Sequence, residues 1–299
     1  MKIKYFCFAV ILSILAFPCF ADSFEETKAS AEKGDAKAQT DLGVMYLEGK
    51  KTKQDYSEAL KWFRESADQG DMKGECGLGA MYYTGSGVEK DNAEAIKWLQ
   101  KSADQGYAKC QYAMGEVYYS GNGVEQNADE AIKWLKMSAD KDFAPAQAAL
   151  GNIYLARIGE HNEAFKWFKK LAENGDKTAQ YSVGVMYYHA DGVEKNDIEA
   201  LKWLTKSAEQ GFVLAQYNLG AIYLAGYSDG KSNKKDLKKS YKWASIAAKK
   251  GNPDAENVLN ILESLKAGKF TENDISVNRD INSPFIKQIF CNSKDKDCK

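Results

Sequence analysis

The six tryptophans of the chain recur at a nearly constant interval, and this regularity restricts the fold more than any other feature. They are separated by 36, 36, 33, 36 and 40 residues. An alanine stands five residues after each tryptophan, and six evenly spaced glycines are each followed by a tyrosine three residues later. Several residue types that share one long period indicate a solenoid of repeated units. The tryptophans are Trp62, Trp98, Trp134, Trp167, Trp203 and Trp243.

Each repeat contains two segments with helical periodicity. In "DMKGECGLGAMYYTG", residues 71–85, small and apolar residues recur at helical spacing. In "NAEAIKWLQKSADQG", residues 92–106, an apolar stripe is flanked by polar residues, and a glycine ends the segment. Asp91 precedes this second segment and Glu94 follows three residues later, which is the spacing of a capping box. Because glycine lowers helix propensity, Gly79 indicates a place where two helices approach closely.

The sequence therefore predicts an all-α fold, a right-handed superhelical solenoid of stacked helix-turn-helix repeats with capping helices. No segment alternates apolar and polar residues over strand length. One hairpin cannot bury its tryptophan face alone, so the neighbouring repeat completes its core. Capping helices are expected in residues 22–34 and 252–268, and residues 269–299 form a C-terminal tail. The six predicted repeats are residues 35–70, 71–106, 107–142, 143–175, 176–211 and 212–251.

The first 21 residues differ from the rest of the chain. Lys2 and Lys4 precede an uncharged apolar run, and Cys19 and Ala21 occupy the small-residue positions before a cleavage site. This layout predicts a signal peptide over residues 1–21, and hence a periplasmic or secreted protein. An uncleaved anchor or a lipid on Cys19 is a less favoured alternative, because the apolar run is short for a membrane span. No second apolar segment follows, so no membrane span is expected in the mature chain.

The charge balance argues against nucleic acid as a partner. The chain has 41 basic and 42 acidic residues, a formal net charge of −1, and lacks the basic stripe that phosphate backbones require. Its two histidines, His161 and His189, have no companions at metal-ligand spacing. We therefore expect neither a metal nor a cofactor.

Four cysteines remain after the predicted leader, which permits two disulfides in an exported protein. Cys291 and Cys298 would close a small loop near the C-terminus. Cys76 and Cys110 lie in neighbouring repeats, where adjacent first helices would bring the sulfur atoms together. A reduced pair in the core is an equally good interpretation of Cys76 and Cys110.

The repeat unit resembles the Sel-1-like repeat, a relative of the tetratricopeptide repeat. The segment "AQYSVGVMYYHADGVEKNDIEALKWLTKSAEQG", residues 179–211, fits the family pattern almost position by position. The resemblance covers residues 35–251 and implies an α/α solenoid that acts as a scaffold for other proteins. It also implies that exported bacterial members serve the cell envelope or contact host cells. Repeat 4 departs from the pattern because it lacks the glycine-rich turn, and repeat 6 carries the lysine-rich insert "GYSDGKSNKKDLKKS".

The resemblance also raises an enzymatic alternative, because some exported relatives are described as penicillin-binding or as weak β-lactamases. Those relatives carry cysteine pairs in nearly every repeat, and this chain does not. Ser30 with Lys33, and Ser138 with Lys141, match the Ser-x-x-Lys spacing of serine acyl enzymes. Glutamine replaces the lysine in other repeats, and the companion motifs are missing, so an exposed helix end is the favoured interpretation. A cell-wall or β-lactam binding protein with weak hydrolase activity remains the alternative function.

Tyrosines on the first helices are the candidate binding residues. Residues seven apart share a helix face, and a tyrosine combines a rigid apolar ring with a hydroxyl that suits protein recognition. We predict a tyrosine track along the groove of a non-enzymatic exported scaffold that binds a protein or peptide. The alternative is that these rings only seal one hairpin against the next. The candidates are Tyr83, Tyr112, Tyr119, Tyr181, Tyr188 and Tyr217.

Overall fold

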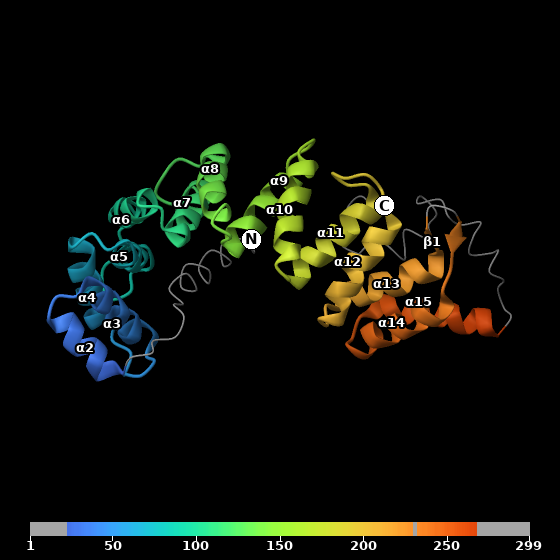
Figure 1. Cartoon of the computed structure of the whole chain (residues 1–299), viewed down its shortest axis with the longest axis horizontal. Helices are drawn as coiled ribbons and strands as arrows, with labels where there is room; N and C mark the ends of the chain where they lie inside the picture. Colours follow the sequence, from blue (N-terminus) through green and yellow to red (C-terminus); the bar gives the residue numbers. More distant parts are fainter. Residues whose placement is uncertain (1–22, 230–231, 268–299) are drawn as a thin grey trace. The chain divides into compact units, whose positions relative to one another are not determined.

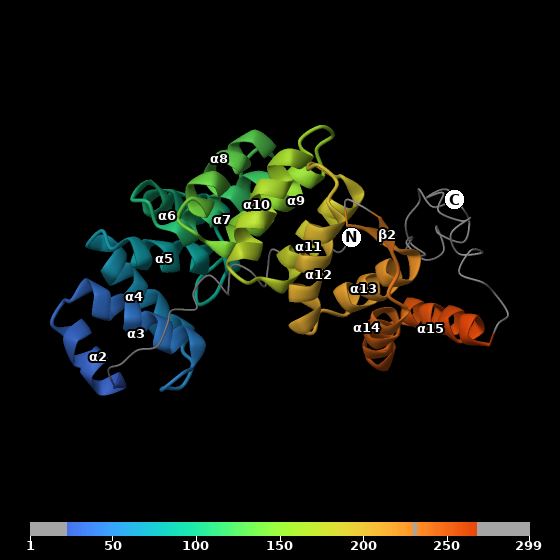
Figure 2. The same ribbon diagram turned by 45° about the vertical axis from the view of Figure 1, so that its right-hand side comes forward.

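The computed structural model describes residues 23–229 and 232–267, where the chain forms fourteen helices and one two-stranded ribbon (Figures 1 and 2). The predicted signal peptide and the predicted Cys291–Cys298 pair lie outside these residues. None of the described helices has both the length and the apolar character needed to cross a membrane. The chain divides into two compact units, residues 1–150 and 151–299, with α9 (Ala144–Leu155) spanning the boundary. The all-α class predicted from the sequence is confirmed.

The first unit is a series of helix pairs in which each second helix also packs against the first helix of the next pair. Its first helix, α2, packs against α3 and begins with a complete capping box formed by Ser23 and Glu26. The helices are α2 (Phe24–Glu32), α3 (Ala36–Glu48), α4 (Tyr56–Asp68), α5 (Met72–Thr84), α6 (Asn92–Asp104), α7 (Ala108–Ser120) and α8 (Ala128–Ala139).

The second unit continues this pairing and ends with α15, which packs against α13 and α14 as the first helix of a further repeat would. In repeat 6, the lysine-rich insert forms an antiparallel ribbon of β1 (Tyr227–Ser228) and β2 (Asn233–Lys234) instead of a glycine turn. The helices are α10 (His161–Glu173), α11 (Lys177–His189), α12 (Asp197–Glu209), α13 (Val213–Ala225), α14 (Leu237–Lys249) and α15 (Pro253–Lys266).

Only half of the capping box predicted at α6 forms. The Asp91 carboxylate accepts hydrogen bonds from the backbone N–H groups of Ala93 and Glu94, at 2.9 and 3.0 Å. The Glu94 carboxylate does not complete the box, because it accepts the indole N–H of Trp98 at 2.7 Å and forms an ion pair with Lys97. The glutamate therefore fixes the tryptophan one turn further along the helix rather than the helix start.

The residue after the tryptophan is the largest fully buried side chain of a typical second helix. Leu99 packs against Gly79 of α5, where a Cβ atom would lie 2.9 Å from the Leu99 Cγ. Any side chain at this glycine would occupy the space of the leucine, so the predicted close approach of the two helices is confirmed. The equivalent pairs are Gly43 with Phe63, Gly115 with Leu135, Gly151 with Phe168, and Gly184 with Leu204.

Only some of the tryptophans are buried in this core, which corrects the expectation that the neighbouring repeat covers each of them. Three are buried and three are only half-buried. Lysine ammonium groups lie over several of the rings, for example Lys101 at 4.0 Å from the ring centroid of Trp98. The long lysine stems can cover apolar ring surface while the charges stay in water. The buried rings are Trp62, Trp203 and Trp243, and the half-buried ones are Trp98, Trp134 and Trp167.

Buried polar side chains tie the helices together through the backbone. A serine of most second helices donates its hydroxyl to a carbonyl oxygen 30 residues earlier, as Ser207 does to Lys177 at 2.6 Å. A glutamine of the first helix donates its Nε2 to a carbonyl oxygen eight residues earlier, at the end of the preceding second helix. These glutamines are called the glutamine ladder, and Glu75 takes their place in repeat 2. The ladder bonds are Gln39–Ala31, Gln111–Ala103, Gln147–Ala139, Gln180–Ala172 and Gln216–Ala208, at 2.9 to 3.2 Å.

The glycine turns lie against the preceding repeat. A Cβ atom at Gly87, in the turn after α5, would lie 2.6 Å from the carbonyl oxygen of Tyr56 at the start of α4. We call the N-terminal end of a second helix, where the next turn lies against it, a turn seat. The described turn contacts of this kind are Gly87 with Tyr56, Gly123 with Asn92 and Ile96, and Gly192 with His161.

Candidate functional site

One series of predicted tyrosines lies between consecutive repeats rather than on an open surface. Tyr112 is buried, and its ring meets Phe143, the residue before α9, edge-on at 5.5 Å. Tyr181 packs against Phe212 with the two rings tilted, at 5.1 Å between ring centroids, and its hydroxyl accepts a hydrogen bond from Asn218 at 3.4 Å. Tyr217 is buried where α13 meets α14 and α15. Burial raises the pKa of Tyr181 and of Tyr217.

The second series occupies the next-to-last residue of three first helices, α5, α7 and α11, and its exposure differs from repeat to repeat. Tyr83 is buried, and its hydroxyl accepts a hydrogen bond from Asn122 of the next repeat at 3.0 Å. Tyr119 is 38% exposed. Tyr188 is half-buried, and the Lys195 ammonium lies 5.5 Å from its ring centroid. Loss of solvent around the Tyr188 hydroxyl raises its pKa to about 12.

The exposure of these rings reduces the number of predicted tyrosines that a partner could contact. Tyr83, Tyr112 and Tyr217 have rings enclosed between elements, so a partner could reach them only by separating the repeats. Tyr119, Tyr181 and Tyr188 keep accessible surface. The candidate surface is therefore carried by two first helices, α7 in the first unit and α11 in the second, and it is not continuous along the chain.

Cys76 and Cys110 are joined by a disulfide in the structure. Their Cα atoms lie 5.9 Å apart, and both side chains are buried between α5 and α7. Cys76 occupies the position of Tyr112 and Tyr181 in its own repeat. A covalent bond therefore stands where other repeats place an aromatic contact.

The Ser138–Lys141 pair of the hydrolase alternative serves the repeat architecture. Ser138 is fully buried, and its hydroxyl donates to the carbonyl oxygen of Ala108 at 2.7 Å, as the equivalent serines do in other repeats. The Lys141 ammonium donates to the carbonyl oxygen of Gly106 instead of approaching Ser138. Gln105 and Gln210, which occupy the position of Lys141, donate to the carbonyl oxygens of equivalent glycines. The geometry of Ser138 and Lys141 thus gives no support to nucleophilic chemistry.

The two histidines belong to repeats 4 and 5. His161 Nδ1 and the Asp191 carboxylate form a close contact between the start of α10 and the turn that follows α11. His189 stands edge-on to Tyr188 at 5.1 Å, and burial lowers its pKa. Among residues 23–229 and 232–267, no group of three or more histidine, cysteine or carboxylate side chains is placed to bind a metal ion.

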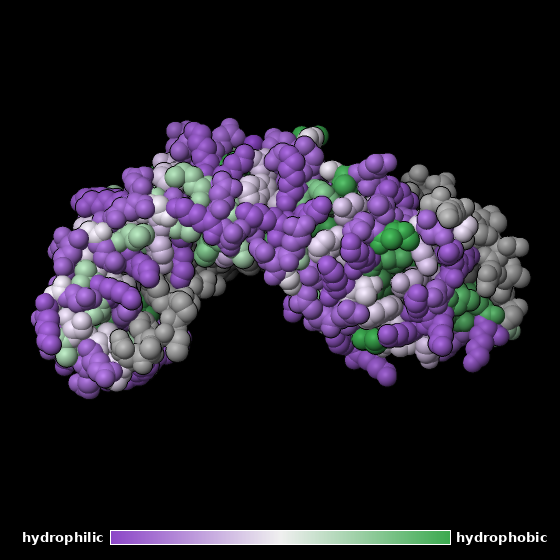
Figure 3. Space-filling model, viewed as in Figure 1, coloured by the Kyte–Doolittle hydropathy of each residue, from purple (hydrophilic) through white to green (hydrophobic). Residues whose placement is uncertain are grey.

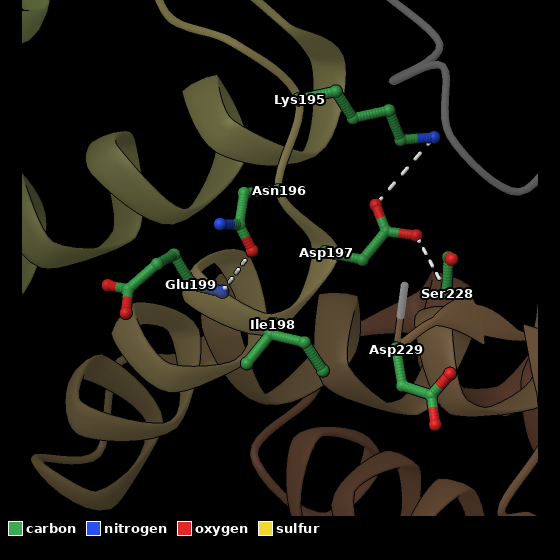
Figure 4. A pocket seen from close by; sticks show the side chains of 7 residues that line it. All are labelled: Lys195, Asn196, Asp197, Ile198, Glu199, Ser228 and Asp229. Atoms are coloured by element: carbon green, nitrogen blue, oxygen red, sulfur yellow. Dashed lines mark hydrogen bonds and ion pairs between the residues drawn. The ribbon is translucent and has the colours of Figure 1, made fainter. Parts of the chain in front are cut away.

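The sequence did not indicate a surface depression of about 590 Å³ at the turn seat of α12, shown in Figure 4. The buried Asp197 carboxylate accepts a hydrogen bond from the backbone N–H of Ser228 at 2.8 Å and pairs with Lys195 at 3.6 Å. The β1–β2 ribbon thus lies against this seat where a glycine turn lies in other repeats. A signal was present in the sequence, because the first residue of this helix is an aspartate only in repeat 5.

Hydrophilic residues cover most of the visible face of each unit (Figure 3). Among the more exposed apolar side chains are Met137, Leu155, Ile158 and Tyr241.

The comparisons with known proteins agree with this architecture. The secretory immunoglobulin A-binding protein EsiB of Escherichia coli O6:H1, strain CFT073, is 36% identical over 55 residues. The match spans 18% of this chain and only 11% of EsiB.

Two solved structures are similar over most of the chain. A Sel1 repeat protein from Oxalobacter formigenes is 30% identical, with a TM-score of 0.59, and the match covers 76% of this chain and 100% of that one. The protein c5321, described as a protective antigen present in uropathogenic Escherichia coli strains, is 26% identical with a TM-score of 0.52. That match covers 86% of this chain and 70% of c5321.

The Sel1 repeat profile matches the chain six times. The matched segments are residues 36–71, 73–107, 108–143, 144–176, 177–212 and 213–252. They make up more than half of the chain and contain the helix pairs, the glycine series and the tryptophan series described above. The chain therefore belongs to the Sel1 repeat family.

Proposed function

We propose that the protein is an exported, non-enzymatic scaffold that binds a protein or peptide partner through the surface of its first helices. Sel1 repeat proteins generally act as protein-interaction scaffolds. The observation that carries the proposal is the contrast within the tyrosine series. Most of these rings seal repeats together, while Tyr119 and Tyr188 keep accessible surface on α7 and α11.

The chemistry of these two tyrosines suits protein recognition. A tyrosine ring offers rigid apolar area with little loss of rotamer entropy, and its hydroxyl can donate or accept a hydrogen bond. The Tyr188 hydroxyl is protonated at neutral pH, as that of an ordinary tyrosine is. Lys195 adds a positive charge over the same ring, so this part of α11 combines an aromatic and a cationic contact.

Export is the second part of the proposal. It is supported by the sequence of residues 1–21, with its basic start, apolar run and small residues before Asp22. The names of the two Escherichia coli relatives, an immunoglobulin-binding protein and a protective antigen, are also those of proteins that meet host molecules. We infer a periplasmic or extracellular location for the mature chain.

A pull-down from a cell-envelope extract tests the binding surface, with the mature chain as bait. Tyr119→Ala removes an exposed first-helix ring, and Tyr56→Ala is the matched control because Tyr56 is 40% exposed on a second helix. Loss of a tyrosine that is a binding hot spot, which costs about 2 kcal/mol or more, reduces affinity by more than about tenfold. We expect the partner to be retained by Tyr56→Ala and depleted by Tyr119→Ala. Equal capture by both folded variants would refute the assigned surface.

The hydrolase alternative is tested separately with a chromogenic β-lactam. We expect the purified mature chain to show no turnover above the uncatalysed rate. Turnover that disappears in the Ser138→Ala variant, with the fold intact, would contradict the non-enzymatic assignment. Because this assay does not depend on a partner, its result is independent of the pull-down.

A further inference from the structure

Repeat 6 departs from the other five at the N-terminal end of its second helix. Four residues before the tryptophan, the other repeats carry a glutamate, and repeat 6 carries Lys239. Two residues before the tryptophan, the others carry an apolar residue, and repeat 6 carries Tyr241. The glutamates are Glu58, Glu94, Glu130, Glu163 and Glu199, and the apolar residues are Leu60, Ile96, Ile132, Phe165 and Leu201.

The side chain two residues before the tryptophan is also more exposed in repeat 6 than its equivalents in repeats 3 and 5. Tyr241 is 54% exposed, whereas Ile132 and Leu201 are 7% and 8% exposed. In α6 the turn of the next repeat lies over this position, since a Cβ atom at Gly123 would lie 2.9 Å from the Cδ1 of Ile96. After α14 the chain continues into α15, and no turn within residues 23–229 and 232–267 covers Tyr241. The α14 turn seat is thus accessible in the described structure.

This seat is a basic depression of about 540 Å³ lined by Asp236, Lys238, Lys239, Tyr241 and Lys242. Three lysines and one aspartate line it, and the aspartate carboxylate is bound to the start of the helix. The Asp236 side chain accepts a hydrogen bond from the backbone N–H of Lys239 at 2.9 Å and pairs with the Lys239 ammonium at 3.2 Å. The Lys242 ammonium lies 5.0 Å from the ring centroid of Trp243. We call these five residues the basic seat.

We propose that the basic seat binds an acidic, glycine-containing loop of a partner protein. The turns against the α4, α6 and α10 seats set the shape of such a loop, because each places a glycine against the start of the helix. Each of these turns continues as Gly-Val-Glu, and the glutamates are Glu89, Glu125 and Glu194. The lysines of the basic seat complement that negative charge more strongly than the mixed seats of the other repeats do.

Charge also selects against a second copy of this chain as the occupant. The turn of repeat 1, which a second copy could offer, reads "GKKTKQ" and contains Lys50, Lys51 and Lys53. Lysines on both sides would repel each other. The basic seat lies on a second helix, so this proposal is independent of the first-helix tyrosines and of the function assigned to them.

Fluorescence anisotropy with a labelled cyclic peptide tests the proposal on the full chain. The probe is "SGNGVEQN", residues 120–127, which is the turn that lies against the α6 seat. We expect the wild type to bind this peptide, and added salt should weaken the binding. The Lys238→Glu/Lys242→Glu variant should bind the peptide about tenfold more weakly than the wild type does. A peptide with Glu125→Lys should bind the wild type about tenfold more weakly than the original peptide does.

The matched control is Lys249→Glu/Lys266→Glu, which makes the same change of net charge at two exposed lysines outside the seat. Its affinity should stay within about twofold of the wild type. Circular dichroism should show equal helicity for all variants. If the charge-reversal variant Lys238→Glu/Lys242→Glu is unstable, Lys238→Gln/Lys242→Gln is used in its place. Absence of binding by the wild type, or equal weakening by the two double variants, would overturn the proposal.

Discussion

We call the contact between two consecutive first helices a seam. The seam between repeats 2 and 3 has the same backbone arrangement as the seam between repeats 5 and 6, but the side chains that meet there differ. In the first unit, Cys76 of α5 is bonded to Cys110 of α7. In the second unit, Tyr181 stands at the position of Cys76 and packs against the ring of Phe212. The glutamine ladder differs as well, because Glu75 precedes Cys76 while Gln180 precedes Tyr181.

The two seams differ in this contact and not in the start of the later helix. Tyr107 and Phe212 are the N-caps of α7 and α13, and neither makes a side-chain cap hydrogen bond, whereas Asp176 caps α11 at the same position of its repeat. Loss of an N-cap costs about 1 kcal/mol, and an aromatic pair contributes about 0.5–1.5 kcal/mol beyond its buried area. An aromatic N-cap thus offsets the lost hydrogen bond by a contact with the preceding repeat.

The largest effect is expected from removing the covalent seam. Cys76→Ala/Cys110→Ala should lower the free energy of unfolding by about 3–4 kcal/mol, because the bond closes a loop with a sequence separation of 34 and restricts the unfolded chain. Urea denaturation measures the change. In a Cys291→Ala/Cys298→Ala variant, which leaves Cys76 and Cys110 as the pair to be reduced, dithiothreitol should cause the same loss of stability. A midpoint that does not respond to the reductant in that variant would show that the bond does not stabilise the seam.

The aromatic seam should respond to loss of the ring more than to loss of the hydroxyl. Tyr181→Ala removes the contact with Phe212 and should lower stability by about 2–3 kcal/mol, less than a fully buried ring because Tyr181 is half-buried. Tyr181→Phe loses only the 3.4 Å hydrogen bond from Asn218 and should cost less than about 1 kcal/mol. If the phenylalanine variant is as unstable as the alanine variant, the hydroxyl and not the ring closes this seam.

Much of the fold follows from the sequence because the repeat supplies six copies of the same signal. The glycine at Gly79 and the apolar residue at Leu99 recur together, so close helix packing could be inferred without the structure. The sequence pattern did not distinguish Trp98 from Leu99, because both fall on one apolar stripe. Which of the two lies deeper depends on the small rotation of the helix toward its neighbour, and this rotation is set by packing between repeats.

The candidate site was harder to predict for a related reason. The environment of Tyr181 depends on Phe212, which lies 31 residues later, and that of Tyr112 depends on Phe143. The exposure of Tyr241 depends on which element follows α14. Helical periodicity describes one helix at a time, so it places a tyrosine on a face but does not show what covers that face.

The turn seats of the two units can be compared in the same way, through the glycines that lie against them. Gly192 faces the backbone of His161, whereas Gly123 faces the side chains of Asn92 and Ile96. Gly192→Ala should therefore cost about 2 kcal/mol, because backbone moves less readily than a side-chain end. Gly123→Ala should cost closer to 1 kcal/mol. Gly175→Ala is the baseline, since Gly175 also has a positive φ but its Cβ would meet no atom within 4 Å.

Thermal unfolding of the three variants measures these differences at equal protein concentration. The expected order of stability loss is Gly192→Ala, then Gly123→Ala, then Gly175→Ala. A loss at Gly192 that equals the loss at Gly175 would mean that backbone conformation alone accounts for it, and that the turn makes no restrictive contact with α10.

The smallest effect expected is a gain in stability at Glu75. In unit 2, Gln180 donates to the carbonyl oxygen of Ala172 at 3.2 Å and accepts from Gln210 at 2.8 Å. Glu75 accepts from Gln105 at 2.7 Å, but an ionised carboxylate cannot donate to a carbonyl oxygen. Glu75→Gln should supply the missing donor and stabilise the protein by about 1 kcal/mol at pH 7.

The pH dependence of the stability shows whether the charge on Glu75 causes the difference between wild type and Glu75→Gln. Burial raises the pKa of Glu75 above its ordinary value of 4.5, so the folded protein binds this proton more tightly than the unfolded chain does. The wild type therefore recovers stability as the pH falls through the raised pKa, and the advantage of Glu75→Gln should shrink in acid. The reciprocal variant Gln180→Glu should lose about 1 kcal/mol at neutral pH and recover it in acid. If both variants instead differ from the wild type equally at pH 4 and pH 7, the difference between the two seams lies in packing and not in the charge on Glu75.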